Sequence, residues 1–277
     1  IKSALDNIDM SVQKGEHPRI GAVDVCPFVP LSGISMDECA ELAKKLAFRV
    51  SKELGICSFL YGAAAISPDR ELLSDLRRGQ YEGFRKRLED CGPHLPDYGP
   101  LDWNETTERF GAVVIGARNI LVAYNVNVDE KDAMVSRKAG SLVRSTGRLL
   151  KKEDGRKTRV PGMLDMVQGM GLPLEAQGIS QVSMNLRDVN ITPMHIAFEA
   201  VREIVNDHGV ETCGSELVGL VPLSAMLDSG KWYAHKDCTD ERELVQAAID
   251  GLGLDNLAPF DSNKRIIEWA LEGRGEQ

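Results

Sequence analysis

Short apolar stretches alternate with amphipathic ones along the whole chain, and this alternation restricts the fold more than any other feature. The stretches with the length and β-branched content of strands are 20–29, 56–61, 111–116, 120–128 and 179–186. The clearest helix pattern begins at Ser35, which forms a capping box with Glu38 three residues on, and it stops at Gly55. The pattern predicts an α/β (α+β) protein.

The alternation occurs twice, and 277 residues suffice for two subdomains of ordinary size. We place the boundary after Asn119, which gives subdomains 1–119 and 120–277, each expected to be a mixed β-sheet with helices packed on one face. No G-x-G-x-x-G follows a strand, so a single doubly wound Rossmann sheet is disfavoured. In the second half we expect a long helix over 130–150 and a hairpin between 162–172 and 179–186.

Composition excludes several classes of function. The net charge is −9 without a block of Lys and Arg, which argues against binding to nucleic acid or to an anionic membrane. No transmembrane run or signal peptide is seen. The six cysteines are scattered and include no C-x-x-C, so we expect a protein of the reducing cytoplasm. The five histidines lack the spacing of metal ligands, so we expect no metal site.

The stretch 14–31 carries the most chemistry. His17 and Arg19 flank Pro18 just before the apolar run 20–29, so an imidazole and a cation are presented at the mouth of a strand that contains Asp24. Imidazole is the side chain best suited to proton transfer near neutral pH. On the residues alone, a structural surface turn is the favoured interpretation, because most single histidines are not catalytic.

A second stretch, 91–108, is rich in Pro, Gly and Asp, and we expect a long loop there. Trp103 and Phe110 near its end supply aromatic faces on which a flat ring system could stack. A plain surface linker is the alternative.

The wording GEHPRIGAVDVCPFVPL at 15–31 resembles the signature of the glutamate formiminotransferase family. The likeness extends to YGAAA at 61–65, AYNVNV at 123–128, QVSMNL at 181–186 and GSELVGLVPL at 214–223. The resemblance implies two α/β subdomains with a substrate tunnel between them. By the same resemblance we expect 1–119 to be the N-terminal subdomain without its first segment, 120–277 to be the C-terminal subdomain, and no cyclodeaminase part to follow.

The resemblance also implies the site residues. His17 is the expected catalytic acid and base, and the expected folate-binding residues are Gly99, Pro100, Leu101, Asp102, Trp103, Asn104, Glu105, Thr106, Thr107, Glu108, Arg109, Phe110 and Gly111. Because both substrates carry carboxylates, we expect Arg19 and Arg118 to bind them. Asp24 is the candidate carboxylate for the cationic amidine. The candidates that complete the polar lining are Asn125, Gln181 and Ser215.

The implied reaction moves a formimino group between N-formimino-L-glutamate and tetrahydrofolate, as part of histidine degradation and one-carbon metabolism. Tetrahydrofolate is then a co-substrate, the partners are small molecules, and a homodimer is expected. Two alternatives stay open: a non-catalytic folate-binding homologue, and a metal-free amidine hydrolase that uses the same histidine.

Overall fold

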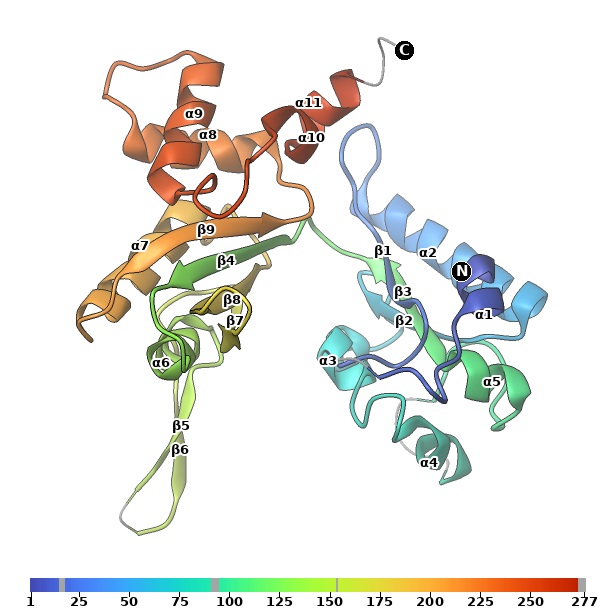
Figure 1. Cartoon of the computed structure of the whole chain (residues 1–277). Helices are drawn as coiled ribbons and strands as arrows, with labels where there is room; N and C mark the ends of the chain where they lie inside the picture. Colours follow the sequence, from blue (N-terminus) through green and yellow to red (C-terminus); the bar gives the residue numbers. More distant parts are fainter. Residues whose placement is uncertain (15–17, 91–94, 153, 274–277) are drawn as a thin grey trace. The chain divides into compact units, whose positions relative to one another are not determined.

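The computed structural model describes residues 1–14, 18–90, 95–152 and 154–273. The chain divides into two compact units, Ile1–Asn119 and Ile120–Gln277 (Figure 1). The elements of the first unit are α1 (Lys2–Asn7), β1 (Asp24–Phe28), α2 (Met36–Leu54), β2 (Cys57–Gly62), the 3-10 helix η1 (Pro68–Arg70), α3 (Leu73–Leu76), α4 (Phe84–Glu89), α5 (Glu105–Phe110) and β3 (Ala112–Ala117). The predicted capping box at Ser35 is formed, and Gly55 ends α2 in the left-handed conformation.

The sheet of the first unit has the order β1-β3-β2, and its strands are parallel. Side chains alternate along it, so that Leu60 and Ile115 pack towards α2 while Phe59 and Val114 pack against residues of α3 and α4. Both faces are apolar, and both must be covered. The expectation of helices on one face only is therefore wrong for this unit.

The elements of the second unit are β4 (Val122–Val128), α6 (Met134–Val143), β5 (Arg148–Lys151), β6 (Lys157–Val160), β7 (Val167–Leu174), β8 (Ile179–Leu186), α7 (Met194–Asn206), β9 (Thr212–Val218), α8 (Leu223–Tyr233), α9 (Glu241–Leu252), α10 (Ser262–Arg265) and α11 (Ile267–Glu272). Its main sheet, β7-β8-β4-β9, is antiparallel, and the predicted β7–β8 hairpin is confirmed. The α/β class is confirmed too, although parallel and antiparallel pairing are separated between the units rather than mixed within each sheet.

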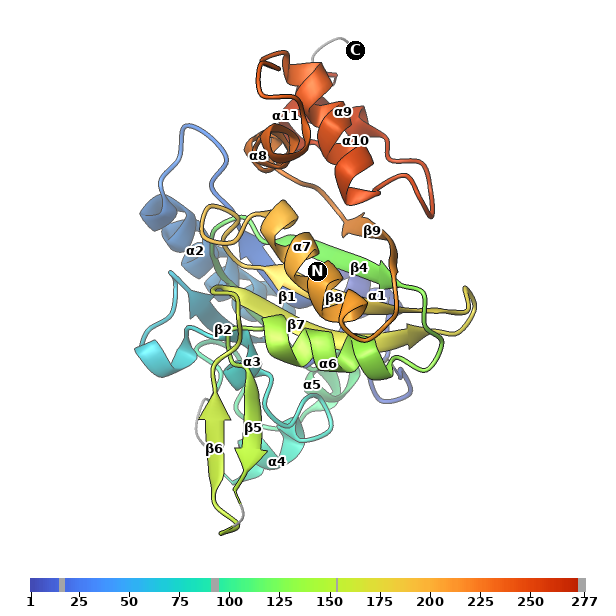
Figure 2. The same cartoon turned by 90° about the vertical axis from the view of Figure 1, so that its left-hand side faces the viewer.

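Strand β4 divides the second unit into an apolar and a polar side. Tyr124 and Val126 are fully buried in the core against helices, and Figure 2 shows α6 and α7 lying across that face. Asn125 lies between these two residues, and Asn127 follows Val126. Both asparagines point to the opposite face, because side chains alternate along a strand.

The long helix expected over 130–150 is wrong. Helix α6 ends at Val143, Arg144 is extended, and the N–H of Ser145 donates to the carbonyl of Val167. The chain then enters the separate β5–β6 ribbon (Figure 1). Similarly, the strand expected over 20–29 is regular only from Asp24 to Phe28. None of the helices in the described ranges is long and apolar enough to cross a membrane.

Candidate functional site

His17 lies outside the described residues, but the segment that follows it is well defined. The N–H of Ala22 donates to the carbonyl of Phe110 over 2.8 Å, and the N–H of Ala112 donates to the carbonyl of Ile20 over 3.1 Å. Gly21 and Gly111 face each other in an antiparallel bridge. The structure thus joins the chain just after His17 to the end of the expected folate-binding segment.

Asp24 fixes the backbone of this segment. Its Oδ1 accepts hydrogen bonds from the N–H of Ile20 (3.0 Å) and from Nε of Arg77 (3.1 Å), and Oδ2 pairs with Nη2 of Arg77. Its φ of +63° is unusual for a residue with a side chain, a conformation often found at functional sites. The sequence predicts that this carboxylate faces the substrate cation. Its oxygens instead accept hydrogen bonds from Arg77 and from the backbone of Ile20, so the side chain holds this segment of the chain in place.

The first expected arginine, Arg19, already has partners of its own. Nη1 of Arg19 lies 2.8 Å from the exposed carboxylate of Glu82, and Nε lies 3.3 Å from the side-chain oxygen of Gln13. The Arg19 carbonyl accepts from the N–H of Tyr81. A substrate carboxylate would therefore have to compete with Glu82 for this cation.

The second expected arginine, Arg118, follows β3 at the carboxyl end of the parallel sheet, where α/β proteins commonly bind ligands. It lies beside Tyr61, whose hydroxyl is buried. Burial raises the pKa of Tyr61, and the charges of Arg118 and Arg77 partly oppose that shift. Sequence reasoning missed Tyr61, although it opens the YGAAA motif. A Cβ on Gly116 would lie 2.4 Å from the Tyr61 ring, so Gly116 makes room for it.

The expected folate-binding segment is only partly a loop. Asn104 caps helix α5 by accepting a hydrogen bond from the N–H of Thr107 (3.0 Å). The loop expected over 91–108 is therefore wrong from Glu105 onwards, where the chain is helical. Phe110 is fully buried and offers no face to a ligand. Trp103 packs against Tyr81, with ring centroids 5.8 Å apart.

Other members of the same segment hold the first unit together. Arg109 donates to the carbonyl of Leu5 at the N-terminal helix (3.0 Å), and the Pro100 carbonyl accepts from the thiol of Cys57 (3.2 Å). The side chains and backbone left exposed to solvent belong to Gly99, Leu101, Asp102, Glu105 and Glu108. A ligand of this segment would meet these residues.

The polar face of the second unit brings together amides and one carboxylate. Nε2 of Gln181 donates to Oδ1 of Asn127 (2.8 Å) and to Oε2 of Glu216 (2.6 Å). Asn127 is fully buried, and its Nδ2 has no partner among the described residues. Asn125, directly opposite Glu216 in the sheet register, shares this face. The sequence analysis did not select Asn127 or Glu216. Asn127 follows Asn125 by two residues on the same face of β4, so the alternation of side chains along the strand indicates it. Glu216 lies opposite Asn125 on the neighbouring strand β9.

Ser215 does not join this group. In the register of β4 and β9 it lies opposite Val126, on the face that the helices cover, and its hydroxyl donates to the carbonyl of Leu252 over 2.7 Å. The expectation that Ser215 completes the polar lining is wrong, because a neighbour of Glu216 along a strand must point the other way.

Two family models match the chain. Residues 1–118 match the formiminotransferase domain, N-terminal subdomain, and residues 123–272 match the formiminotransferase domain. The chain belongs to the formiminotransferase family. It is 37% identical to the glutamate formimidoyltransferase of Streptococcus pyogenes serotype M1 over 88% of this chain and 76% of that protein. The corresponding protein of Thermoplasma acidophilum is also 37% identical, over 90% of this chain and 77% of its own.

A longer relative is the formimidoyltransferase-cyclodeaminase of Mus musculus, 40% identical over 100% of this chain. The chain spans about half the length of the formimidoyltransferase-cyclodeaminases that it matches, since 49% of the mouse protein is covered.

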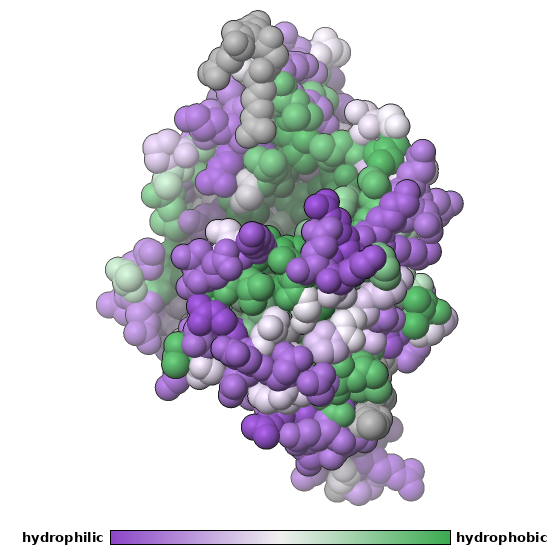
Figure 3. Space-filling model, turned by 90° about the vertical axis from the view of Figure 1, so that its right-hand side faces the viewer, coloured by the Kyte–Doolittle hydropathy of each residue, from purple (hydrophilic) through white to green (hydrophobic). Residues whose placement is uncertain are grey.

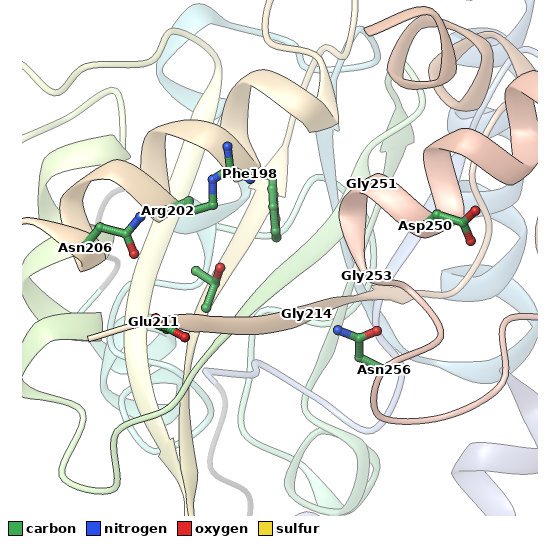
Figure 4. Close-up of a pocket in the computed structure, with 10 residues that line it drawn as sticks. Phe198, Arg202, Asn206, Glu211, Gly214, Asp250, Gly251, Gly253 and Asn256 are labelled. Carbon is green, nitrogen blue, oxygen red and sulfur yellow. The ribbon is translucent and has the colours of Figure 1, made fainter. Parts of the chain in front are cut away.

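A pocket of about 340 Å³ lies in the second unit, between α7, the start of β9 and the end of α9 (Figure 4). Its polar lining includes Arg202 and Asn206, but none of the residues expected from the sequence. Arg202 is paired with Glu199. Gly214 is a glycine because the Asn256 side chain approaches it: a Cβ on residue 214 would lie 2.7 Å from the Cβ of Asn256.

Within the described residues, no three His, Cys, Asp or Glu side chains gather to hold a metal.

Proposed function

We propose that this chain transfers the formimino group of N-formimino-L-glutamate to tetrahydrofolate, giving 5-formimino-tetrahydrofolate and glutamate. Membership of the formiminotransferase family supports this activity, as do two relatives named glutamate formimidoyltransferase. One structural observation carries the assignment of the site: backbone hydrogen bonds join Ile20 and Ala22, just after His17, to the end of the segment expected to bind folate.

In the proposed reaction, N5 of tetrahydrofolate attacks the amidine carbon and a tetrahedral intermediate forms. The bond between that carbon and the glutamate nitrogen then breaks. N5 loses one proton and the departing nitrogen gains one, so a single imidazole can serve as base and then as acid. We assign this role to His17, and such catalysis typically contributes ~10²–10⁴ in rate.

The remaining residues of the proposed site bind and orient. Asp24 holds the backbone after His17 through Ile20. Arg118, with Tyr61 beside it, offers a cation and a hydroxyl to a carboxylate. Taken by itself, the second unit offers the amides of Asn127 and Gln181. Its Glu216 accepts from Gln181 and has no cation within ion-pair distance among the described residues, so within this unit Glu216 is the candidate carboxylate for a cationic group.

The test is an assay of 5-formimino-tetrahydrofolate formation from both substrates, with His17→Ala and, as a matched control, the exposed His235→Ala. We expect the first variant to lose at least ~10²-fold in kcat and the second to keep its rate. Release of ammonia or formamide without tetrahydrofolate would instead identify an amidine hydrolase. Binding of tetrahydrofolate without turnover would identify a non-catalytic homologue.

We also propose the cytoplasm as the site of action. Cys26, Cys39, Cys57, Cys213 and Cys238 are free thiols, which suits a reducing compartment.

A further inference from the structure

Asn127 carries a hydrogen-bond donor that nothing in the described part of the chain uses. The residue is fully buried, its Oδ1 accepts from Nε2 of Gln181 over 2.8 Å, and its Nδ2 has no partner there. The hydrophilic residues that cover much of the face drawn in Figure 3 can bond to water. A buried donor has no such choice, and leaving it unpaired destabilises the protein. Asn127 therefore calls for an acceptor that a ligand can supply.

A free acceptor lies close to this donor. Oε2 of Glu216 accepts from the same nitrogen of Gln181 over 2.6 Å, whereas Oε1 of Glu216 makes no hydrogen bond to any described residue. Because one nitrogen bonds to both side chains, a single ring system can reach Asn127 and Glu216 together. The register of β4 and β9 also shifts just after Asn127, an irregularity that is common beside functional sites.

The face of the sheet around this pair is open to solvent and carries no positive charge from its own strands. The register places Met170, Ser183 and Asn125 in one row with Glu216. Met170 on β7 is 55% exposed and Val218 on β9 is 59% exposed, so neither edge of the face is covered within this unit. None of the strands β4, β7, β8 and β9 contains a lysine or an arginine. The face thus suits an uncharged polar ring better than a carboxylate.

The proposed substrates offer two different groups to Glu216. The amidinium of N-formimino-L-glutamate would pair with the carboxylate, but it has no acceptor for Nδ2 of Asn127. The α-carboxylate next to that amidinium would also be repelled by Glu216. The pyrimidine half of tetrahydrofolate matches both side chains, because its 2-amino and ring N–H groups donate while its 4-oxo group accepts.

We propose that the second unit binds the pterin ring of tetrahydrofolate by this pyrimidine edge, an inference that rests on the proposed function. The two N–H groups of the ring donate to Glu216, and Nδ2 of Asn127 donates to the 4-oxo group. Gln181 holds both side chains in place through its own hydrogen bonds and is a positioning residue. Charge alone would leave Glu216 open to the amidinium, and the donor beside it selects the ring.

Titration calorimetry of the full chain with folic acid and with aminopterin tests the proposal without any substitution. In aminopterin an amino group replaces the 4-oxo group, so a donor faces Asn127 and the ring nitrogen opposite Glu216 has no hydrogen. We expect folic acid to bind about tenfold more tightly or better, since each mismatch leaves a buried or charged group unpaired. Equal Kd values for the two compounds, or no binding of folic acid, would overturn the proposal.

The near-isosteric variant Glu216→Gln tests the carboxylate. It should raise the Kd of folic acid about tenfold or more and keep KM for N-formimino-L-glutamate within about twofold. The control, Glu175→Gln, changes an exposed acid in the turn between β7 and β8 and should alter neither value. A higher KM for N-formimino-L-glutamate with unchanged folic acid binding would assign Glu216 to the amidine and refute the proposal.

Binding and turnover fail separately. A chain that prefers folic acid to aminopterin but forms no 5-formimino-tetrahydrofolate would retain the ring site and refute the transfer reaction. A chain that forms the product but binds both compounds equally would retain the reaction and refute the ring site.

Discussion

The carboxylate of Asp24 and the guanidinium of Arg77 form an ion pair in which Oδ1 lies 3.1 Å from Nε. The side chains are 19% and 23% exposed, so water screens the pair only in part. The same oxygen of Asp24 accepts from the N–H of Ile20, three residues after His17. Arg77 therefore acts on the proposed catalytic segment through Asp24.

Asp24→Asn should slow the reaction without preventing folding. Loss of the ion pair should cost about 1–3 kcal/mol of unfolding free energy, and displacement of the segment after His17 should lower kcat by roughly 10–10²-fold. Urea unfolding and the transfer assay measure the two effects. The control, Asp75→Asn, breaks the exposed pair with Arg78 and should change stability by less than about 1 kcal/mol. An unchanged kcat in Asp24→Asn would remove Asp24 from the site.

Asn127→Ala should affect both stability and binding. It leaves the Gln181 amide without one acceptor in a buried network, which costs about 1–3 kcal/mol. If the free Nδ2 of Asn127 binds substrate, KM for one substrate should rise while kcat falls less. The exposed Gln177→Ala, in the turn between β7 and β8, is the control. Unfolding free energies and KM for each substrate separate the two effects, and a purely structural residue would leave KM unchanged.

His195 should make the second unit less stable in acid. The residue is 8% exposed, and its ring stacks on Trp232 with centroids 5.1 Å apart. Burial lowers the pKa of His195, opposed by Asp228 and Glu199, so the unfolded chain binds a proton more readily than the folded one. Stability should therefore fall as pH drops below about 6.5, the ordinary pKa of histidine.

His195→Gln should reduce this slope between about pH 7 and pH 5, measured by urea unfolding at several pH values. The exposed His235→Gln is the control and should retain the slope. An equal slope in all three proteins would show that other groups cause the acid sensitivity.

Gly99→Ala should expose the thiol of Cys57. Gly99 has φ +102°, and a Cβ there would lie 2.6 Å from the carbonyl oxygen of Ile56, so the segment must move. Burial raises the pKa of the Cys57 thiol to about 11, and it should resist iodoacetamide at pH 8 in the native protein. Mass spectrometry after alkylation should find Cys57 modified in the variant. Gly155→Ala has positive φ but open space around it and should leave Cys57 protected.

The sequence predicted secondary structure best where capping residues within the segment itself determine its ends. The helix that begins after Ser35 and ends at Gly55 was predicted almost to the residue, because capping side chains and a left-handed glycine act locally. The expected continuation of α6 to residue 150 failed, because Ser145 and its neighbours bond to β7, a tertiary contact that no local pattern encodes.

The candidate site was harder to predict for the same reason. Asn125 and Gln181 could be chosen from strand position, but the face that Ser215 takes depends on the β4–β9 register. Arg77 is distant in sequence from Asp24, and no spacing rule links the two residues.

Strand β4 carries the apolar core on one side and the amide group on the other, residue by residue, from Val122 to Val128. Deletion of a single residue within it would therefore invert every later position, sending amides inward and valines outward. We expect relatives of this chain to vary in length at the tip of the ribbon, around Gly155, and to keep β4 free of insertions and deletions.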